Sequence, residues 1–89
     1  MATARYRLNV SNPARKEALA LPRDVQERIR PVVTALADQP RPHGCEKLKG
    51  AEDYYRIRVG DYRVVYHVDD GELTITVTRI KHRRDVYRR

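Results

Sequence analysis

The chain has 89 residues, a length that allows one small domain with a single core. Its 19 lysines and arginines outnumber its 12 aspartates and glutamates, so the formal net charge is +7 and a phosphate-rich partner is expected. The sole cysteine, Cys45, excludes an internal disulfide, and neither a membrane span nor a signal-peptide core is apparent. We therefore expect a single domain, residues 1–89, in the reducing cytoplasm, with no membrane association.

The first third of the sequence predicts a strand followed by two helices. Polar and apolar residues alternate over residues 5–10, which indicates a half-buried strand. Asn12 is expected to cap a short helix that has Pro13 at its first position. A second helix is expected from Pro22, with apolar residues at helical spacing as far as Leu36. Pro31 interrupts this spacing, so we expect a kink or two abutting segments there.

Three β-type runs follow a predicted loop at residues 41–50. Turn signals at Gly60-Asp61 and at residues 69–71 separate these runs and predict an antiparallel meander. The third run is expected to begin at Leu73 and to bury alternate residues. The predicted fold is α+β, in the order β-α-α-β-β-β, with a helical hairpin packed on an antiparallel sheet and a basic C-terminal tail.

Arginine alternates with apolar or aromatic residues in the first two β-type runs. Because successive side chains of a strand point to opposite faces, Arg56 and Arg58 share one face, with Arg63 in or near the same exposed row. The tail adds Arg83 and Tyr87. Such a set can hold a phosphodiester, neutralise charge developing on its oxygens and stack a base. It suits RNA cleavage by a ribose 2′-hydroxyl; a solvated arginine face is the alternative.

Other residues are weaker candidates for chemistry. His82 lies within the basic tail and is a candidate acid or base, because histidine exchanges protons near neutral pH. No metal-ligand or nucleotide-binding motif is present, so no cofactor or metal is expected. His43 and His67 are interpreted as structural, and Tyr55, Tyr62 and Tyr66 as core residues. Additional contacts to RNA are assigned to Lys47, Lys49, Lys81 and Arg84.

Three segments resemble a known family: KLKG at 47–50, YYRIRVGDYRVVY at 54–66 and RIKHRRDVYRR at 79–89. With the order of the predicted elements, they are similar to the RelE branch of the RelE/ParE superfamily of bacterial type II toxins. The resemblance implies a metal-independent endoribonuclease that cuts mRNA in the ribosomal A site and leaves a cyclic phosphate. It also implies a cognate antitoxin as partner, and operator DNA as a partner of the toxin–antitoxin complex.

The same resemblance implies roles for individual residues. Arg63 and Arg83 match family arginines that contact the scissile phosphate, and Tyr87 matches the tail tyrosine that stacks on the substrate or orients its hydroxyl. Arg56 and Arg58 stand where the best-known member has lysines. Arginine does not lose its proton at physiological pH, so these two positions are either purely electrostatic or leave proton transfer to the tail histidine.

Two other functions remain open on the sequence. One is a ParE-like toxin that binds DNA gyrase and has no nuclease activity, although the tail pair Arg83 and Tyr87 argues against it. The other is a non-catalytic basic module of the same fold that binds RNA or the ribosome.

Overall fold

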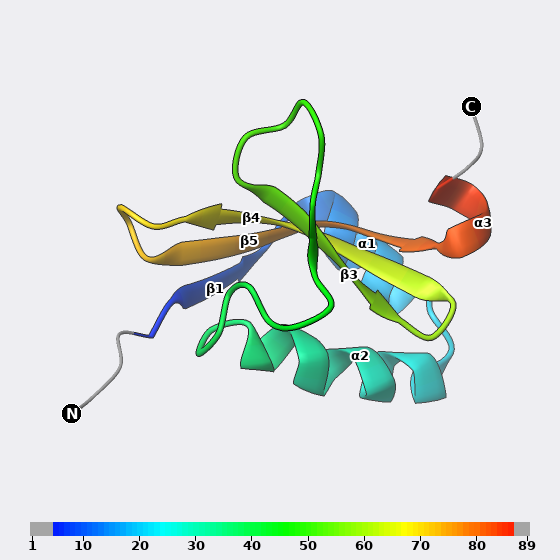
Figure 1. The fold of residues 1–89 in the computed structure, drawn as a ribbon. Helices are drawn as coiled ribbons and strands as arrows, with labels where there is room; N and C mark the ends of the chain where they lie inside the picture. The colour runs from blue at the N-terminus through cyan, green and yellow to red at the C-terminus, as the bar shows by residue number, and fades with distance from the viewer. Residues whose placement is uncertain (1–4, 87–89) are drawn as a thin grey trace.

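A computed structural model describes residues 5–86, and within this range the chain forms three helices and five strands (Figure 1). Strand β1 (Arg7–Val10) precedes helices α1 (Asn12–Leu19) and α2 (Arg23–Ala35). The other elements are β2 (Glu46–Lys47), β3 (Tyr54–Val59), β4 (Tyr62–Asp69), β5 (Thr74–His82) and α3 (Arg83–Val86). None of these helices has the length and apolar character needed to cross a membrane.

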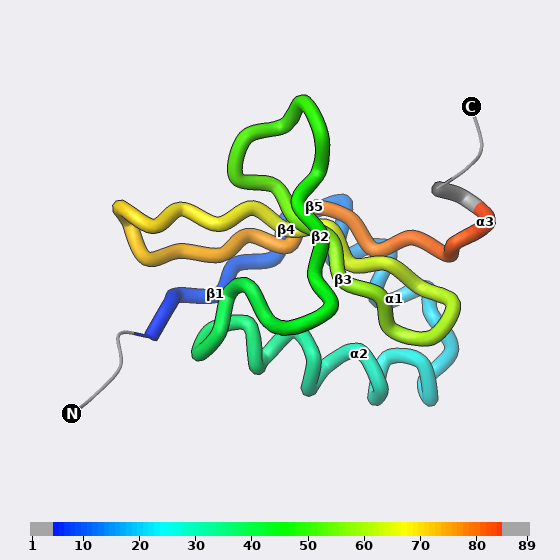
Figure 2. The backbone as a smooth tube through the Cα atoms, in the orientation of Figure 1, coloured from blue at the N-terminus to red at the C-terminus, as the bar shows by residue number. Residues whose placement is uncertain are grey.

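The strands form one mixed sheet in the order β1-β5-β4-β3-β2. The expected meander is confirmed, because β3 pairs antiparallel with β4 and β4 with β5. The prediction of a wholly antiparallel sheet is wrong at one edge, where β1 pairs parallel with β5. The segment between β1 and β3, which includes both helices, brings the chain back to the end of the sheet where β1 began, so β3 runs in the same direction as β1. Because β4 runs in the opposite direction, β5 again runs in the direction of β1. In addition, β2 lies within the predicted loop (Figure 2).

The two turns of the meander differ in length. Val59 pairs with Tyr62 across Gly60-Asp61, which confirms the predicted tight turn. Asp69 pairs with Thr74, so Leu73 belongs to the second turn, where its φ is 50° and its exposed fraction 39%. The prediction that Leu73 begins the third strand is therefore wrong. The Asp69 side chain accepts a hydrogen bond from the Glu72 N–H at 2.9 Å, a local bond that favours the longer turn.

The structure differs from the prediction in the residue that caps α1 and in the continuity of α2 at Pro31. Ser11 caps α1, since its Oγ accepts a hydrogen bond from the Ala14 N–H at 3.3 Å, whereas Asn12 is the first helical residue. Helix α2 runs through Pro31 as a single element, so the alternative of two abutting segments is wrong, whereas the kink stays a prediction. An interior proline costs about 3 kcal/mol, a cost that burial of Ile29 before it and Leu36 after it can offset.

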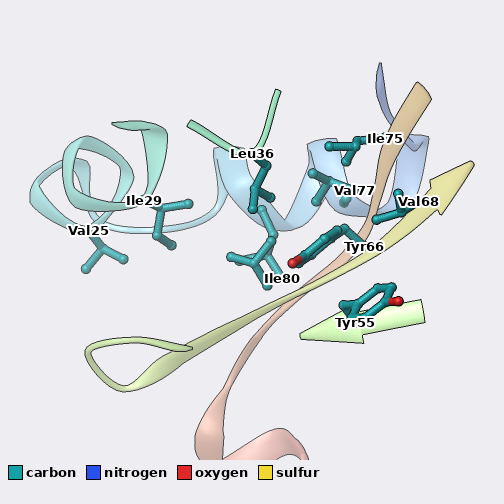
Figure 3. Packing of buried hydrophobic residues seen from close by; sticks show 11 residues of the cluster. Val25, Ile29, Leu36, Tyr55, Tyr66, Val68, Ile75, Val77 and Ile80 are labelled. Carbon is teal, nitrogen blue, oxygen red and sulfur yellow. The ribbon is translucent and has the colours of Figure 1, made fainter. Parts of the chain in front are cut away.

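The core lies between the helices α1 and α2 on one side and the sheet on the other (Figure 3). Tyr66 and Leu36 have no exposed surface, and Tyr55 stacks on Tyr66 with ring centroids 5.9 Å apart, so these tyrosines are core residues as predicted. Opposite β4, the register of β5 skips one residue, because Tyr66 pairs with Val77 whereas Val65 pairs with Arg79. This bulge lets Val77 and Ile80, three residues apart, both face the core.

Glu17 of α1 closes the edge of β5 where β1 has ended. Its carboxylate accepts a hydrogen bond from the Ile80 N–H at 2.7 Å and lies 2.8 Å from an Arg79 nitrogen and 3.0 Å from Lys81 Nζ. Burial alone would raise the pKa of Glu17, but the bonds from Arg79, Ile80 and Lys81 lower it to about 2. The carboxylate thus replaces the missing strand partner.

This lowered pKa predicts an acid-sensitive fold. Because the pKa of Glu17 is lower in the folded than in the unfolded chain, its stabilisation is present above pH 4.5 and is lost as pH falls towards 2. We expect Glu17→Gln to lower the free energy of unfolding at pH 7 by about 1–3 kcal/mol and to flatten its dependence on pH below 5. Denaturant unfolding at several pH values measures both effects.

The matched control is Glu27→Gln, because Glu27 is exposed and forms only a 3.8 Å pair with Arg23 on the surface of α2. It should change the stability by no more than about 0.5 kcal/mol. Parallel stability curves for wild type and Glu17→Gln from pH 7 to about pH 2 would contradict the role of this carboxylate.

Candidate functional site

A row of three basic residues crosses the sheet on the face opposite the core tyrosines. Arg58 on β3 pairs directly with Arg63 on β4, and Arg63 pairs directly with Lys81 on β5. Arg56 lies two residues along β3 from Arg58 and therefore on the same face. Like charges directly opposite each other on neighbouring strands are destabilising. An anion bound over this row would relieve that repulsion.

Arg63 differs from the expectation of an exposed or nearly exposed arginine. Its exposed fraction is only 6%, although it lies on the arginine side of the sheet. Its position explains this burial, because it stands on the central strand between Arg58 and Lys81. A guanidinium keeps its charge when buried, and a lower local dielectric constant strengthens its field on a nearby anion.

The first of two hollows lies where β2 meets β3. It has a volume of about 310 Å³ and is lined by Gly44, Glu46, Arg56, Arg58 and Arg63. Glu46 Oε1 accepts a hydrogen bond from Arg56 Nε at 2.8 Å. This bond, followed by the charges of Arg56, Arg58 and Arg63, lowers the pKa of Glu46 below its ordinary value. An ionised carboxylate therefore stands among the arginines.

Glu46 is a site residue that the sequence did not predict, as is Asp61, which was expected only as part of a turn. Its place beside Arg56 depends on β2, a strand of two residues within a segment that reads as a loop. A single acidic residue in such a segment carries no periodic signal. Only the pairing of Glu46 with Arg56 across the two strands identifies it.

The second hollow adjoins the first at the start of the tail. It has a volume of about 550 Å³ and shares Arg58 and Arg63 with the first hollow. Its other lining residues are Asp61, His82, Arg83 and Arg84. The two shared arginines thus lie between Glu46 on one side and the tail residues on the other.

His82 is held by two contacts. Its ring meets that of Tyr62 edge to face, with centroids 5.1 Å apart, and its Nδ1 accepts a hydrogen bond from the Arg84 N–H at 3.1 Å. An Nδ1 that accepts carries no proton in the neutral ring, so the proton of that form is on Nε2. Nε2 is therefore the atom through which the neutral ring can donate a hydrogen bond.

The turn between β3 and β4 positions the start of α3. The Arg83 N–H donates a hydrogen bond to the Asp61 carbonyl oxygen at 2.7 Å. The side chains of these residues are 4.0 Å apart and both 68% exposed, so their ion pair is weak. The backbone bond brings the tail beside Arg58 and Arg63, while the Arg83 guanidinium stays accessible.

The structure thus gathers most of the predicted residues and leaves some apart. Arg56, Arg58, Arg63, His82, Arg83 and Arg84 all line the two hollows. Lys81 extends the arginine row but pairs with Glu17, and Lys49 lies exposed in the loop before β3. Lys47 pairs with Tyr55 and so faces away from Arg56. Tyr87 lies outside the described residues.

The chemistry of this arrangement is that of an anion site. Converging guanidinium groups bind phosphate oxygens through short, charge-assisted hydrogen bonds and stay protonated throughout a reaction. Within residues 5–86, no cluster of three or more histidine, cysteine or acidic side chains is placed to hold a metal ion. The site offers cations for a phosphodiester, one imidazole and two carboxylates, Glu46 beside Arg56 and Asp61 beside Arg83.

Comparisons with known proteins agree on one family. The sequence model of the family described as the ParE toxin of the type II toxin–antitoxin system parDE matches residues 8–87. A putative RelE-like toxin protein of Escherichia coli is 32% identical, over 93% of this chain and 90% of the relative. Toxin RelG of Mycobacterium tuberculosis is 28% identical, over 94% of this chain and 98% of the relative.

Solved structures agree with these sequences. The archaeal RelE–RelB complex of Pyrococcus horikoshii contains a chain with a TM-score of 0.78 and 31% identity, covering 88% of this chain and 94% of that one. The isolated E. coli RelE toxin has a TM-score of 0.77 and 29% identity, covering 86% of this chain and 83% of its own. The arginine-lined sheet, the basic tail and these likenesses together establish that the chain belongs to the RelE/ParE superfamily of type II toxins, as a toxin of the RelE type.

Proposed function

We propose that this toxin cleaves mRNA on the ribosome by attack of a ribose 2′-hydroxyl on the adjacent phosphate, so that translation stops in the cytoplasm. The observation that carries the proposal is the position of Arg58 and Arg63, which both hollows share. A phosphate bound to these two arginines has RNA-sized space on either side. Space on both sides is compatible with in-line attack, in which the attacking and leaving oxygens lie on opposite sides of phosphorus.

The arginines supply the electrostatic part of catalysis. Negative charge accumulates on the phosphoryl oxygens as the 2′-oxygen bonds to phosphorus, and Arg58, Arg63 and Arg83 can neutralise it. The fixed strands hold Arg58 and Arg63 in place before the substrate binds, so little reorganisation is needed during the reaction. Repulsion within the arginine row is relieved as the charge develops.

The remaining task is proton transfer, which the arginines cannot perform. In our proposal Glu46 accepts the proton of the 2′-hydroxyl. The doubly protonated form of His82, whose Nδ1 no longer accepts from the Arg84 N–H, donates its Nε2 proton to the departing 5′-oxygen and keeps its Nδ1 proton. The new bond joins the 2′-oxygen to phosphorus, and the bond from phosphorus to the 5′-oxygen breaks. The lowered pKa keeps Glu46 ionised but makes it a weak base. A phosphate that draws Arg56 away from Glu46 would raise its basicity.

A cognate antitoxin is the partner that we propose as inhibitor. The P. horikoshii RelE and the E. coli RelBE structures are toxins in complex with antitoxins, and the E. coli complex has a TM-score of 0.78 with this chain. An antitoxin that covers the hollows would block access to Arg58 and Arg63, and one that displaces the tail would remove Arg83 from the second hollow.

A gyrase-directed action is the second candidate, because the matching family model carries the description of the ParE toxin. Sequencing of mRNA 5′ ends after brief expression, beside a DNA supercoiling assay with gyrase, separates the two. Inhibition of supercoiling without new mRNA ends would overturn the proposed cleavage, whereas ends in phase with codons and unaffected supercoiling would support it.

Removing Arg58 should separate activity from stability. We expect Arg58→Ala to lower the rate of mRNA cleavage on programmed ribosomes by about 100- to 1,000-fold. Its free energy of unfolding should stay the same or rise, because the repulsion from Arg63 disappears. Arg83→Ala should lower the rate similarly, whereas Arg15→Ala, on the exposed side of α1, serves as control and should cleave normally. Cleavage by Arg58→Ala at the wild-type rate would refute the site.

Replacing Glu46 by glutamine tests the proton acceptor. We expect Glu46→Gln to lower the single-turnover cleavage rate by about 100-fold or more. Its affinity for programmed ribosomes should be unchanged or higher, because a negative charge beside the bound phosphate is lost. The control is Glu72→Gln in the exposed turn between β4 and β5. An unchanged rate in Glu46→Gln would remove this carboxylate from proton transfer.

A further inference from the structure

Tyr54 and His67 form an aromatic pair on the arginine side of the sheet. Tyr54 on β3 pairs directly with His67 on β4, and their ring centroids lie 4.8 Å apart at an interplanar angle of 59°. Both residues are half-buried, so neither is enclosed in the core. Alternation along the strands places Tyr54 on the same face as Arg56, and His67 on the same face as Arg63.

The core does not account for this pair. Tyr54 is absent from the described core cluster and from the half-buried apolar residues packed against it, a group that includes Tyr62. Tyr55 and Tyr66, the next residue pair of the same two strands, stack together on the opposite side. The ring pair at Tyr54 and His67 therefore lies on the outer surface, where it can meet a ligand.

The position of the pair relative to the arginines follows from the strand register. Arg56, which pairs with Val65, lies two residues along β3 from Tyr54. Arg58, which pairs with Arg63, lies four residues along β3 from Tyr54. Two residues of a strand span about 6.6 Å, so the pair lies about 7 Å from Arg56 and about 13 Å from the Arg58–Arg63 pair. The second hollow, at the start of the tail, lies on the side of Arg58 away from Tyr54.

We propose that Tyr54 and His67 form a stacking platform for one nucleobase that flanks the cleaved bond. This inference rests on the proposed function, since it places the scissile phosphate at Arg58 and Arg63 and extends the RNA strand past Arg56. Aromatic rings beside a cationic track are the arrangement that binds single-stranded nucleic acid, because every base has a face that stacks. An unpaired base can lie on an open sheet face, whereas a duplex hides its base faces.

The loop that precedes β3 borders the platform. The Leu48 N–H donates a hydrogen bond to the Tyr54 carbonyl oxygen at 2.9 Å, and the Val68 N–H donates to the Asp53 carbonyl oxygen at 2.9 Å. These bonds fix both ends of the loop, which carries the exposed Lys49 and rises on the side of the sheet away from α2 (Figure 1). Lys49 is thereby available for a phosphate next to the stacked base.

The platform can be tested by combining substitutions in the protein with mRNAs that lack a single nucleobase, and by asking whether the two effects on binding are independent. Ribosomes are programmed with mRNA that carries 2′-O-methyl groups, which block the attacking hydroxyl, so that binding is measured without cleavage. An abasic site is then placed in turn at each position of the A-site codon and its neighbours. Binding is measured for wild type, Tyr54→Ala, Tyr54→Phe and His67→Ala, with thermal unfolding of each protein.

We expect Tyr54→Ala to bind the intact mRNA about tenfold or more weakly than wild type, and Tyr54→Phe to bind normally because its ring remains. At one position, an abasic site should weaken the binding of wild type by a similar factor. The same abasic site should not weaken the binding of Tyr54→Ala any further, since both changes remove the same stacking contact. His67→Ala should show a smaller loss at the same position. Thr76→Ala, which faces His67 from β5, is the control and should bind normally.

Three results would overturn the platform. The first is equal binding by wild type and Tyr54→Ala. The second is that, at every abasic position, the loss of binding caused by the abasic site is as large in Tyr54→Ala as in wild type. The third is no measurable binding by wild type. A merely structural aromatic pair would lower the unfolding temperature of Tyr54→Ala without this coupling. Cleavage of unmodified mRNA is measured in parallel: coupling without cleavage leaves the platform standing and refutes the proposed reaction, whereas cleavage without coupling refutes the platform alone.

Discussion

The pleat of β4 is the constraint on which the rest of this molecule depends. Val64, Tyr66 and Val68 point to one side and have no exposed surface, so the core is built on them. Arg63 and His67 point to the other side because they occupy the alternate positions. A shift of one residue in its pairing would turn the charged residues into the core and the valines out. Core packing therefore holds the arginine side in register.

The concentration of arginine on one side requires compensation from elsewhere in the chain. Three carboxylates supply it, each from a different element: Glu17 of α1 pairs with Arg79 and Lys81, Glu46 of β2 pairs with Arg56, and Asp61 of the hairpin turn faces Arg83. They hold the rim of the basic surface. Arg58 and Arg63, at its centre, lie directly opposite each other on neighbouring strands, where like charges repel. An anionic substrate bound over these two residues, as we propose, would reduce this repulsion.

Much of the fold could be predicted from local patterns. The alternation in residues 54–68 reports which side chains share a face, and the Gly60-Asp61 signal reports the hairpin, because both depend only on neighbouring residues. The predictions that the structure contradicts concern places where contacts between distant segments outweigh the local conformational preference of the sequence. Pro31 stays within one helix because core contacts hold both of its sides, and β1 joins β5 in parallel because of the path between them. Neither effect is visible in a short window of sequence.

The sequence by itself determined the residue types of the site and the side of the sheet on which Arg56, Arg58 and Arg63 stand, since strand alternation needs no knowledge of the partner strands. Tertiary structure alone decided that Arg63 is buried, that Glu46 reaches the arginines through β2, and that the hairpin turn at Asp61 holds the start of the tail. It also decided that Tyr54 and His67 meet. Each of these depends on strand pairing between residues that are separated along the chain, and such pairing is set by the register and packing of the whole sheet.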